Sequence, residues 1–291
     1  MSLEAKQAPR SLAWTCVAPR PLITLLDGPL GTELAARGVP TPLPEWSAAA
    51  LRSSPEIVAA IHRDYAAAGA TVHVANTFRT RRRTCPLDWE LLARRAVALA
   101  RSAVPAAQVV AGSLAPLEDC YRPDLSPADP EPEHRELAEV LVDAGCDLLL
   151  VETMPHGGEA LAALAAARAT GVPVWVAFTG GPEGKLMAPA AMGALARQAV
   201  AAGAAAVLVN CVAADRTLPF VEAMRGCGVP VGAYANAGAP DAAMGWRPLA
   251  LAADRYLELA AGWVAAGASI LGGCCGTGIP HVKALADRYR S

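Results

Sequence analysis

Three cysteines stand in a pattern that suits a catalytic metal site. Cys274 and Cys275 are adjacent within the glycine-rich segment 272–277, and Cys211 follows the strand-like run 207–210. Adjacent cysteines between glycines can place two sulfurs on one ion, and Cys211 can supply a third. Three thiolates without a fourth protein ligand describe an open zinc site, and open zinc sites take part in catalysis.

The thiolate ligands restrict the reaction that such a site supports. Zinc held by histidines stays cationic and activates water, whereas three thiolates give the centre a negative formal charge that disfavours this reaction. The same centre can bind a substrate thiol as a fourth ligand and deprotonate it, although a free thiol has a pKa of about 8.5. The sequence therefore predicts alkylation of a bound thiolate. An onium methyl donor would leave as a neutral molecule, so no general acid is required.

The histidines and the other cysteines receive structural interpretations. None of the five histidines ends a predicted strand, and His73 lies inside one. A lone cysteine is usually a small buried hydrophobic residue. We assign that role to Cys16, Cys85, Cys120, Cys146 and Cys227.

Two other interpretations of the glycine-rich segment stay open. A disulfide between Cys274 and Cys275 would leave Cys211 without a role. A phosphate-binding loop would lack the lysine that usually follows its glycines.

The elements that carry these residues alternate between apolar runs and alanine-rich helical stretches. Near-continuous apolar strands that alternate with helices are typical of a parallel sheet covered by helices. Eight candidate strands have this character: residues 22–27, 71–76, 108–113, 147–152, 174–178, 206–210, 231–234 and 269–271.

A weak internal repeat supports this count. Gly69, Gly145, Gly203 and Gly267 each end a helix just before strands two, four, six and eight, where glycine suits a left-handed cap. A Val-Pro pair precedes strands three, five and seven instead. The alternation favours eight βα units that close on themselves.

The predicted architecture is a single (β/α)8 barrel, the TIM barrel, with its active site at the carboxyl ends of the strands. Such a barrel needs about 250 residues, and the domain spans residues 1–291, with 1–20 as an N-terminal extension. The alternative is a doubly wound open sheet. That fold would need a G-x-G-x-x-G fingerprint after strand one, which segment 27–32 lacks.

Polar residues follow the strands at positions that a barrel gathers at one mouth. They are Asp27, Asn76, Ser113, Glu152, Thr179, Cys211, Asn236 and the pair Cys274 and Cys275. In a (β/α)8 barrel this end of the strands carries the active site. Polar residues also begin wherever a strand ends, so the prediction depends on the carboxylates and the three cysteines rather than on any single Asn or Thr.

Two proline-rich segments supply most of the extra length. Residues 114–134 follow strand three, and residues 38–55 follow the start of the first helix. Long loops in compact domains are usually functional or disordered, so we expect the first of them to cover the substrate. The basic run 79–83 is short, and we interpret it as the solvated start of a helix.

The composition limits the partners and the location. The chain is 54% hydrophobic with a net charge of −2, which offers nothing for nucleic acid or an anionic membrane surface. No apolar run is long enough to cross a bilayer, and the N-terminus lacks the features of a signal peptide. We expect a cytoplasmic protein whose eight cysteines are reduced and able to bind metal.

Five motifs resemble those of one known family. They are residues 27–34, 76–78, 152–155, 210–211 and 272–277. Together they resemble the homocysteine S-methyltransferases, which include the homocysteine-binding module of cobalamin-dependent methionine synthase and the betaine-dependent enzymes. The likeness extends over residues 22–280, and the two cysteine motifs are its most specific part.

The resemblance implies a zinc-dependent barrel that methylates homocysteine to methionine. It assigns Cys211, Cys274 and Cys275 as ligands of Zn²⁺. It also assigns Asp27 and Glu152 as partners of the substrate's ammonium group. Physical chemistry agrees, because a zwitterionic amino acid needs a carboxylate beside its amine.

The resemblance also implies further substrate contacts. Gly28 and the backbone amides before the first helix can take the substrate's carboxylate, as a helix N-terminus takes an anion. Thr32 and Asn76 belong to the same motifs and are further substrate-binding candidates. Asn236 resembles a family asparagine whose side-chain oxygen can occupy the fourth zinc position before the substrate arrives.

The donor, the acceptor and the oligomeric state stay open. The chain ends soon after the last cysteine motif, so we expect a short stand-alone member that uses S-methylmethionine or S-adenosylmethionine. Selenocysteine is an alternative acceptor. A non-catalytic zinc- or thiol-binding barrel would not need the two carboxylates, and a zinc hydrolase would need histidine ligands.

Overall fold

The computed structural model describes residues 23–237 and 253–290 of the chain. The predicted extension 1–20 and Cys16 lie outside the described residues. The eight strands within these ranges are β1 (Thr24–Leu25), β2 (Val72–Val74), β3 (Val109–Leu114), β4 (Leu148–Met154), β5 (Val174–Phe178), β6 (Ala206–Ala213), β7 (Val231–Asn236) and β8 (Ala268–Gly273).

Helices follow the strands, with two extra short ones after β1. The described helices are α1 (Leu30–Ala36), α2 (Ala50–Ser53), α3 (Pro55–Ala68), α4 (Trp89–Ala103), α5 (Glu131–Asp143), α6 (Gly157–Arg168), α7 (Pro189–Ala201), α8 (Leu218–Met224), α9 (Ala253–Ala265) and α10 (Ile279–Tyr289). None of them is both long and apolar enough to cross a membrane.

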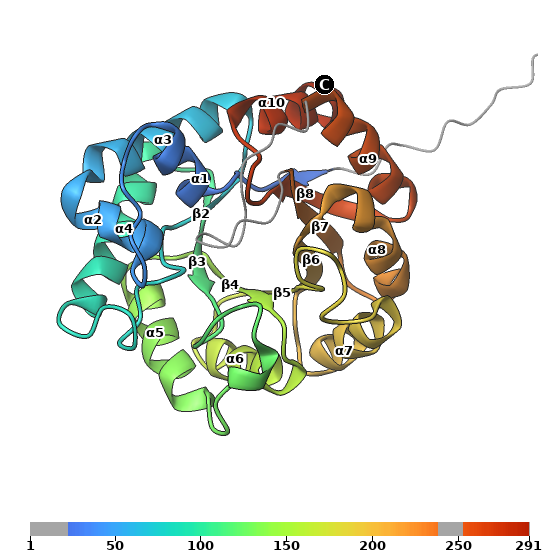
Figure 1. Cartoon of the computed structure of the whole chain (residues 1–291), viewed down its shortest axis with the longest axis horizontal. Coiled ribbons are helices and arrows are strands. Elements are labelled where there is room, and N and C mark those ends of the chain that lie inside the picture. Colours follow the sequence, from blue (N-terminus) through green and yellow to red (C-terminus); the bar gives the residue numbers. More distant parts are fainter. Residues whose placement is uncertain (1–22, 238–252, 291) are drawn as a thin grey trace, which may run out of the picture.

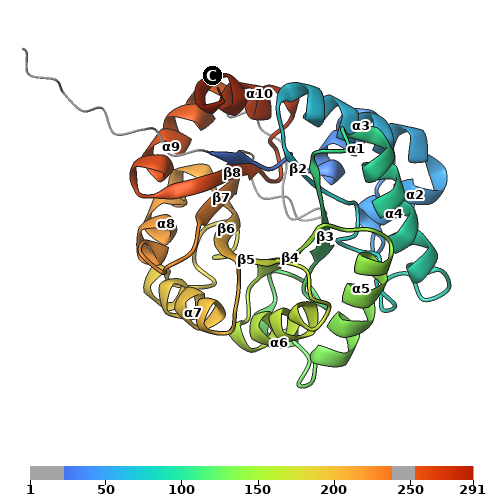
Figure 2. The same cartoon turned by 180° about the vertical axis from the view of Figure 1, so that it is seen from behind.

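The strands form one closed barrel inside a ring of helices (Figure 1), and the view from behind shows the same ring (Figure 2). Neighbouring strands are parallel, in the order β1-β8-β7-β6-β5-β4-β3-β2. The bridge between Leu26 and Val72 joins β1 to β2, and Thr71 N–H donates to the Leu25 carbonyl at 2.8 Å. The predicted (β/α)8 barrel is therefore confirmed.

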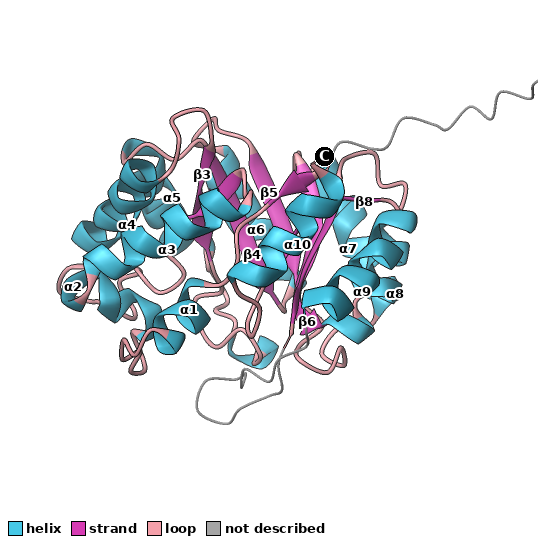
Figure 3. Cartoon of the chain, turned by 90° about the horizontal axis from the view of Figure 1, so that it is seen from above, coloured by secondary structure: helices cyan, strands magenta, loops and turns pink. Residues whose placement is uncertain are grey.

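Apolar side chains form two layers, one inside the barrel and one between the strands and the helices that flank them in Figure 3. Leu25 of β1 and the next residue, Leu26, divide between these layers, since Leu25 packs toward the helices and Leu26 toward the interior. This alternation follows from the pleat of a strand. Leu150 and Leu208 fill the interior beside Leu26, so the barrel centre is a packed core and only its mouth is left for a site.

The four glycines that were predicted to cap helices do so. Gly69, Gly145, Gly203 and Gly267 all have positive φ angles, between 94° and 111°. Residues other than glycine adopt this conformation only with strain. The repeat in the sequence therefore reflects a repeated turn from helix to strand.

The basic run 79–83 differs from its predicted role as a solvated helix start. The helix α4 begins only at Trp89, and Arg81 is buried, with its guanidinium donating to the carbonyls of Phe78 and Glu118. Arg83 pairs with Glu133. Arg81 and Arg83 thus join the loop after β2 to the proline-rich segment 114–134. The folded chain brings carbonyl and carboxylate oxygens of that segment within their reach.

Candidate active site

A cavity of about 430 Å³ opens at the carboxyl ends of the strands. Of the predicted site residues, seven line it: Asp27, Gly28, Asn76, Glu152, Cys211, Cys274 and Cys275. Thr32 and Asn236 are not among the lining residues. The barrel thus brings together residues from five strand ends that are far apart in the sequence.

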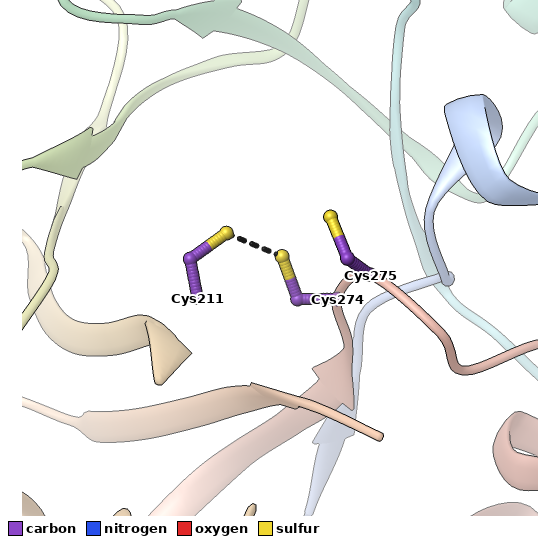
Figure 4. Close-up of side chains that lie close together, drawn as sticks. All are labelled: Cys211, Cys274 and Cys275. Carbon is purple, nitrogen blue, oxygen red and sulfur yellow. Dashed lines mark hydrogen bonds between the residues drawn. The ribbon is translucent and has the colours of Figure 1, made fainter. Parts of the chain in front are cut away.

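The three cysteines predicted as ligands converge on one point. Their Sγ atoms lie within 4.8 Å of one another, and those of Cys211 and Cys274 are 2.6 Å apart. Figure 4 shows the three side chains projecting from the ends of β6 and β8 toward the same space. The convergence makes a single ion the simplest common partner for the sulfurs.

The backbone at Cys211 is bent so that its side chain enters the mouth. The β6–β7 register shifts between Asn210 and Ala213, and Cys211 has a φ of 53°. A bulge of this kind re-aims a side chain, and a positive φ outside glycine stores strain of about 1–3 kcal/mol. The predicted strand ended at residue 210, and the bulge explains why the observed strand continues to Ala213.

A second bulge in β4 supports the first. Thr153 has a φ of 57° at a register shift between β4 and β5. The Asn210 side chain crosses to it, accepting from Thr153 N–H at 3.1 Å and donating to Thr153 Oγ1 at 2.7 Å. Both side chains also approach Cys211 Sγ, at 3.7 Å from Asn210 Nδ2 and 3.9 Å from Thr153 Oγ1. We call Asn210 and Thr153 the clamp of Cys211.

The glycines around Cys274 and Cys275 have a geometric reason. Gly276 has a φ of 77°, which turns the chain sharply after the cysteine pair. A Cβ at Gly273 would lie 2.1 Å from Thr277 Oγ1, which donates to the Cys274 carbonyl at 2.7 Å. The turn therefore lets two adjacent sulfurs face one position.

The sulfurs fit a soft cation. Hydrogen bonds from Cys211 and Cys274 hold the pKa of Cys275 well below its usual range. Hydrogen bonds with Cys274 and Cys275 raise the pKa of Cys211 instead. One thiolate therefore forms at the expense of the others until a cation offsets their charge. Two sulfurs bound at about 2.3 Å on a tetrahedral ion are about 3.8 Å apart, so a modest separation of Cys211 from Cys274 would seat all three.

Glu152 is a buried carboxylate held by two hydroxyl donors. Ser113 donates to its Oε1 and Tyr234 to its Oε2, the latter at 3.0 Å. Burial raises the pKa of Glu152 to about 7, and the two hydrogen bonds oppose this rise. Within the described residues it forms no ion pair with a lysine or arginine. A cationic ligand would satisfy it.

Asp27 faces the cavity from the end of β1. Its Oδ2 accepts from Val74 N–H at 3.1 Å, and only 3% of the residue is exposed. Burial raises its pKa well above the usual value, the Val74 N–H lowers it, and the charge of Glu152 raises it again. A positive charge near both Asp27 and Glu152 would favour their ionised forms and lower their raised pKa values.

The other predicted substrate contacts have mixed placements. Asn76 lines the cavity and donates to the Ser47 carbonyl at 2.9 Å, which ties the segment 38–55 to β2. Thr32 Oγ1 accepts from Gly276 N–H at 3.2 Å and so supports the cysteine turn. Asn236 is buried, and its Oδ1 and Nδ2 have no hydrogen-bond partner among the described residues.

Both proline-rich segments contribute residues that the sequence did not single out. Trp46 comes from 38–55 and Tyr121 from 114–134. Phe78 of the motif 76–78 and Arg79 of the basic run also line the cavity. The expected loop over the site thus lines the cavity. Cys120, interpreted as a buried hydrophobic residue, is partly exposed and lines the cavity too. The sequence offered one signal for Tyr121: it is an aromatic residue in a proline-rich loop that follows a strand.

The fold and the site define a class, a barrel enzyme with a candidate metal site made of thiols beside two buried carboxylates. The family model described as homocysteine S-methyltransferase matches residues 24–289. A homocysteine S-methyltransferase from Escherichia coli is 33% identical, over 91% of this chain and 95% of the relative. The chain belongs to the homocysteine S-methyltransferase family, so the predicted membership and methyltransferase class are confirmed.

Two further comparisons bear on metal and acceptor. The metallated form of the homocysteine methyltransferase MmuM from Escherichia coli superposes with a TM-score of 0.76 at 29% identity, over 92% of this chain and 96% of that one. A selenocysteine Se-methyltransferase from Brassica oleracea is 22% identical, over 92% of this chain and 89% of the relative. The family thus includes metallated members and members named for different acceptors.

Proposed function

We propose that the protein transfers a methyl group from a sulfonium donor to the thiolate of homocysteine and releases methionine. The observation that carries the proposal is one cavity in which three thiols face two buried carboxylates without a lysine or arginine partner among the described residues. A thiol amino acid complements both groups, because its sulfur matches a metal held by the cysteines and its ammonium matches the carboxylates.

The metal that we propose is Zn²⁺, held by Cys211, Cys274 and Cys275. Three sulfur ligands suit zinc and leave one position open for the substrate. When bound, zinc lowers the pKa of the substrate thiol so that the thiolate is present at neutral pH. The buried amide of Asn236 is our candidate for the fourth position before substrate binds, since its oxygen has no other described partner.

The chain's own residues orient the amino acid. Asp27 and Glu152 hold the ammonium, and the backbone around Gly28 takes the carboxylate. A Cβ at Gly28 would lie 2.5 Å from the Tyr65 hydroxyl, so only glycine fits between Tyr65 and the cavity at this position. Asn76, just after β2, holds the segment 38–55 at the cavity, and Thr32 on α1 supports the turn after the cysteine pair.

The donor binds on the aromatic side of the cavity. The rings of Trp46 and Phe78 meet edge to face at 5.9 Å, and Tyr121 joins them from the loop after β3. Aromatic faces attract a sulfonium cation, which favours S-methylmethionine or S-adenosylmethionine. The thiolate's electron pair forms the new S–CH3 bond while the donor's S–CH3 bond breaks, and its pair stays on the donor sulfur. The donor leaves neutral, so no residue must supply a proton.

The test is formation of methionine from homocysteine with a deuterated-methyl donor, followed by mass spectrometry. Protein of verified zinc content should label methionine with S-methylmethionine or S-adenosylmethionine, and Cys275→Ser should not. Absence of labelled methionine with every onium donor, betaine included, would refute the proposal. Competition between homocysteine and selenocysteine then decides the preferred acceptor. We place this reaction in the cytoplasm, where thiols stay reduced.

A further inference from the structure

A second group of metal-binding side chains lies behind Asp27, between β2 and α3. Oδ2 of Asp27 is 3.8 Å from Nδ1 of His62 and 3.9 Å from Nδ1 of His73, and these atoms all lie within 4.8 Å of one another. Both histidines are fully buried. None of the sulfurs belongs to this group, which we call the histidine cluster.

Both imidazoles of the histidine cluster are neutral. Burial, with a smaller contribution from the neighbouring His73, lowers the pKa of His62 to about 3. Burial also lowers the pKa of His73, although its hydrogen bond to Gln108 opposes this. A neutral imidazole keeps one ring nitrogen with a free lone pair, which is the form that binds a metal.

The hydrogen bond of His73 decides which nitrogen is free. Nε2 of His73 lies 2.8 Å from Oε1 of Gln108, and an amide oxygen can only accept. With this amide orientation Nε2 carries the hydrogen, and Nδ1 keeps its lone pair 3.9 Å from Asp27 Oδ2. Two electron-rich atoms facing each other in a buried place repel unless a positive charge lies between them.

The ring nitrogens without hydrogen-bond partners also favour a metal ion here. Both ring nitrogens of His62 and Nδ1 of His73 are buried and have no hydrogen-bond partner among the described residues. A buried polar group without a partner costs about 1–3 kcal/mol. Metal-binding histidines almost always donate their other N–H to an oxygen, as His73 does to Gln108.

We infer that Asp27, His62 and His73 form a second metal site, separate from the three thiols, for a divalent ion of the zinc and cobalt class. Imidazole and carboxylate ligands suit these ions. Ligands at about 2.0–2.2 Å from one ion are about 3–3.5 Å apart, so each must move by less than about 1 Å. The ion can enter from the main cavity, because Asp27 lines it.

The site has a consequence that rests on the proposed function. Asp27 is also our receptor for the substrate's ammonium, and an ion on its Oδ2 would offset the charge that attracts the amine. The second ion and homocysteine should therefore weaken each other's binding by the same factor. Excess metal would act as an inhibitor that competes with the amino acid.

The first test counts ions without turnover. Reduced, chelator-treated full-length protein is titrated with Co²⁺ and followed by its absorbance. We expect two equivalents, one with an intense thiolate charge-transfer band and one with only weak visible bands. Cys275→Ser should lose the first, His62→Gln and His73→Val should lose the second, and His134→Gln, a buried histidine outside the cluster, should keep both. One equivalent in the unaltered protein, or two in His73→Val, would overturn the site.

A gentler variant keeps all three ligands. Gln108→Leu removes only the acceptor of His73 N–H, and the second ion should bind about 10–100-fold more weakly while the first is unaffected. Unchanged affinity for both ions in Gln108→Leu, measured on folded protein, would contradict the ligand assignment of His73.

The second test is kinetic and separates this inference from the proposed function. With the thiol site saturated, added Co²⁺ should raise the KM for homocysteine and leave kcat unchanged. His73→Val should lose this effect and also controls for chelation of Co²⁺ by free homocysteine. A bound second ion that leaves the KM unchanged would overturn the antagonism, whereas failure of methyl transfer itself would leave the ion count of the first test intact.

Discussion

The sulfur side and the carboxylate side of the barrel mouth are built in different ways. On the sulfur side, irregular backbone places the ligands, with Cys211 at a bulge and Gly276 in a left-handed turn. Its hydrogen bonds to sulfur are long, at 3.7 and 3.9 Å. On the carboxylate side, strong donors define the site: Val74 N–H for Asp27, and the hydroxyls of Ser113 and Tyr234 for Glu152.

The difference follows from the partner that we propose for each side, a metal ion for the sulfurs and a substrate for the carboxylates. A thiolate ligand is stabilised mainly by its ion, so the fold needs only to aim the sulfur. Burial disfavours the charged form of a carboxylate, and hydrogen bonds to that form oppose the resulting rise in its pKa. Damage to the sulfur side should therefore remove metal and activity together, whereas damage to the carboxylate side should change binding and pH dependence.

The largest effect should come from the sulfur side. Cys211→Ser or Cys275→Ser should weaken zinc binding by more than about 100-fold, since even the loss of an outer partner costs about 10–100-fold. Activity should fall in parallel. Metal content after dialysis, by mass spectrometry, checks this. Cys146→Ala, a buried cysteine outside the cavity, is the matched control, and a serine variant with full zinc would refute the assignment.

On the carboxylate side, Glu152→Gln should weaken homocysteine binding. A hydrogen bond to a charged group contributes about 1.5–3 kcal/mol, so the KM should rise about 10–100-fold at pH 8 with the donor's KM unchanged. The control is 4-mercaptobutyrate, an acceptor without the amine, whose KM should not respond to the substitution. An equal loss for both acceptors would show that Glu152 does not bind the ammonium.

The clamp of Cys211 should have an intermediate effect on zinc. Thr153→Val keeps the shape of the side chain but removes the hydroxyl that meets Asn210 and approaches Cys211. We expect about tenfold weaker zinc binding, measured by competition with a chelator. The same substitution at Thr170, a half-buried threonine outside the cavity that donates to the Ala167 carbonyl, should leave zinc unaffected. Unaltered affinity in Thr153→Val would mean that the bulge alone positions the sulfur.

The smallest effect should be a shift along the pH axis. The Tyr234 hydroxyl stabilises ionised Glu152, so Tyr234→Phe should raise the pKa of Glu152 above about 7. A rise of one unit lowers the ionised fraction at pH 7 about fivefold. The value of kcat/KM for homocysteine should fall at pH 7 and recover as the pH rises toward 9. A profile that is unmoved, or moved to lower pH, would contradict this role.

Much of the fold and part of the site could be predicted because they depend on local patterns. Gly69 and its three counterparts mark turns that only glycine adopts without strain, and the apolar runs mark the buried strands. Cys274 and Cys275 could be predicted as a pair that faces one position for the same reason, since the glycines that turn the chain there are their immediate neighbours in the sequence. Tyr234 was missed because it looks like any strand residue until β4 brings Glu152 to its hydroxyl.

The sequence by itself determined the eight βα units, the three cysteines and the two carboxylates, because strand ends in a barrel converge whatever the details. Only the tertiary structure decided that Asn210 clamps Cys211 through Thr153, that Tyr121 reaches the cavity, and that two neutral histidines stand behind Asp27. These contacts join residues tens of positions apart. Their geometry depends on bulges, loop paths and burial, which follow from the packing of the whole barrel rather than from spacing along the chain.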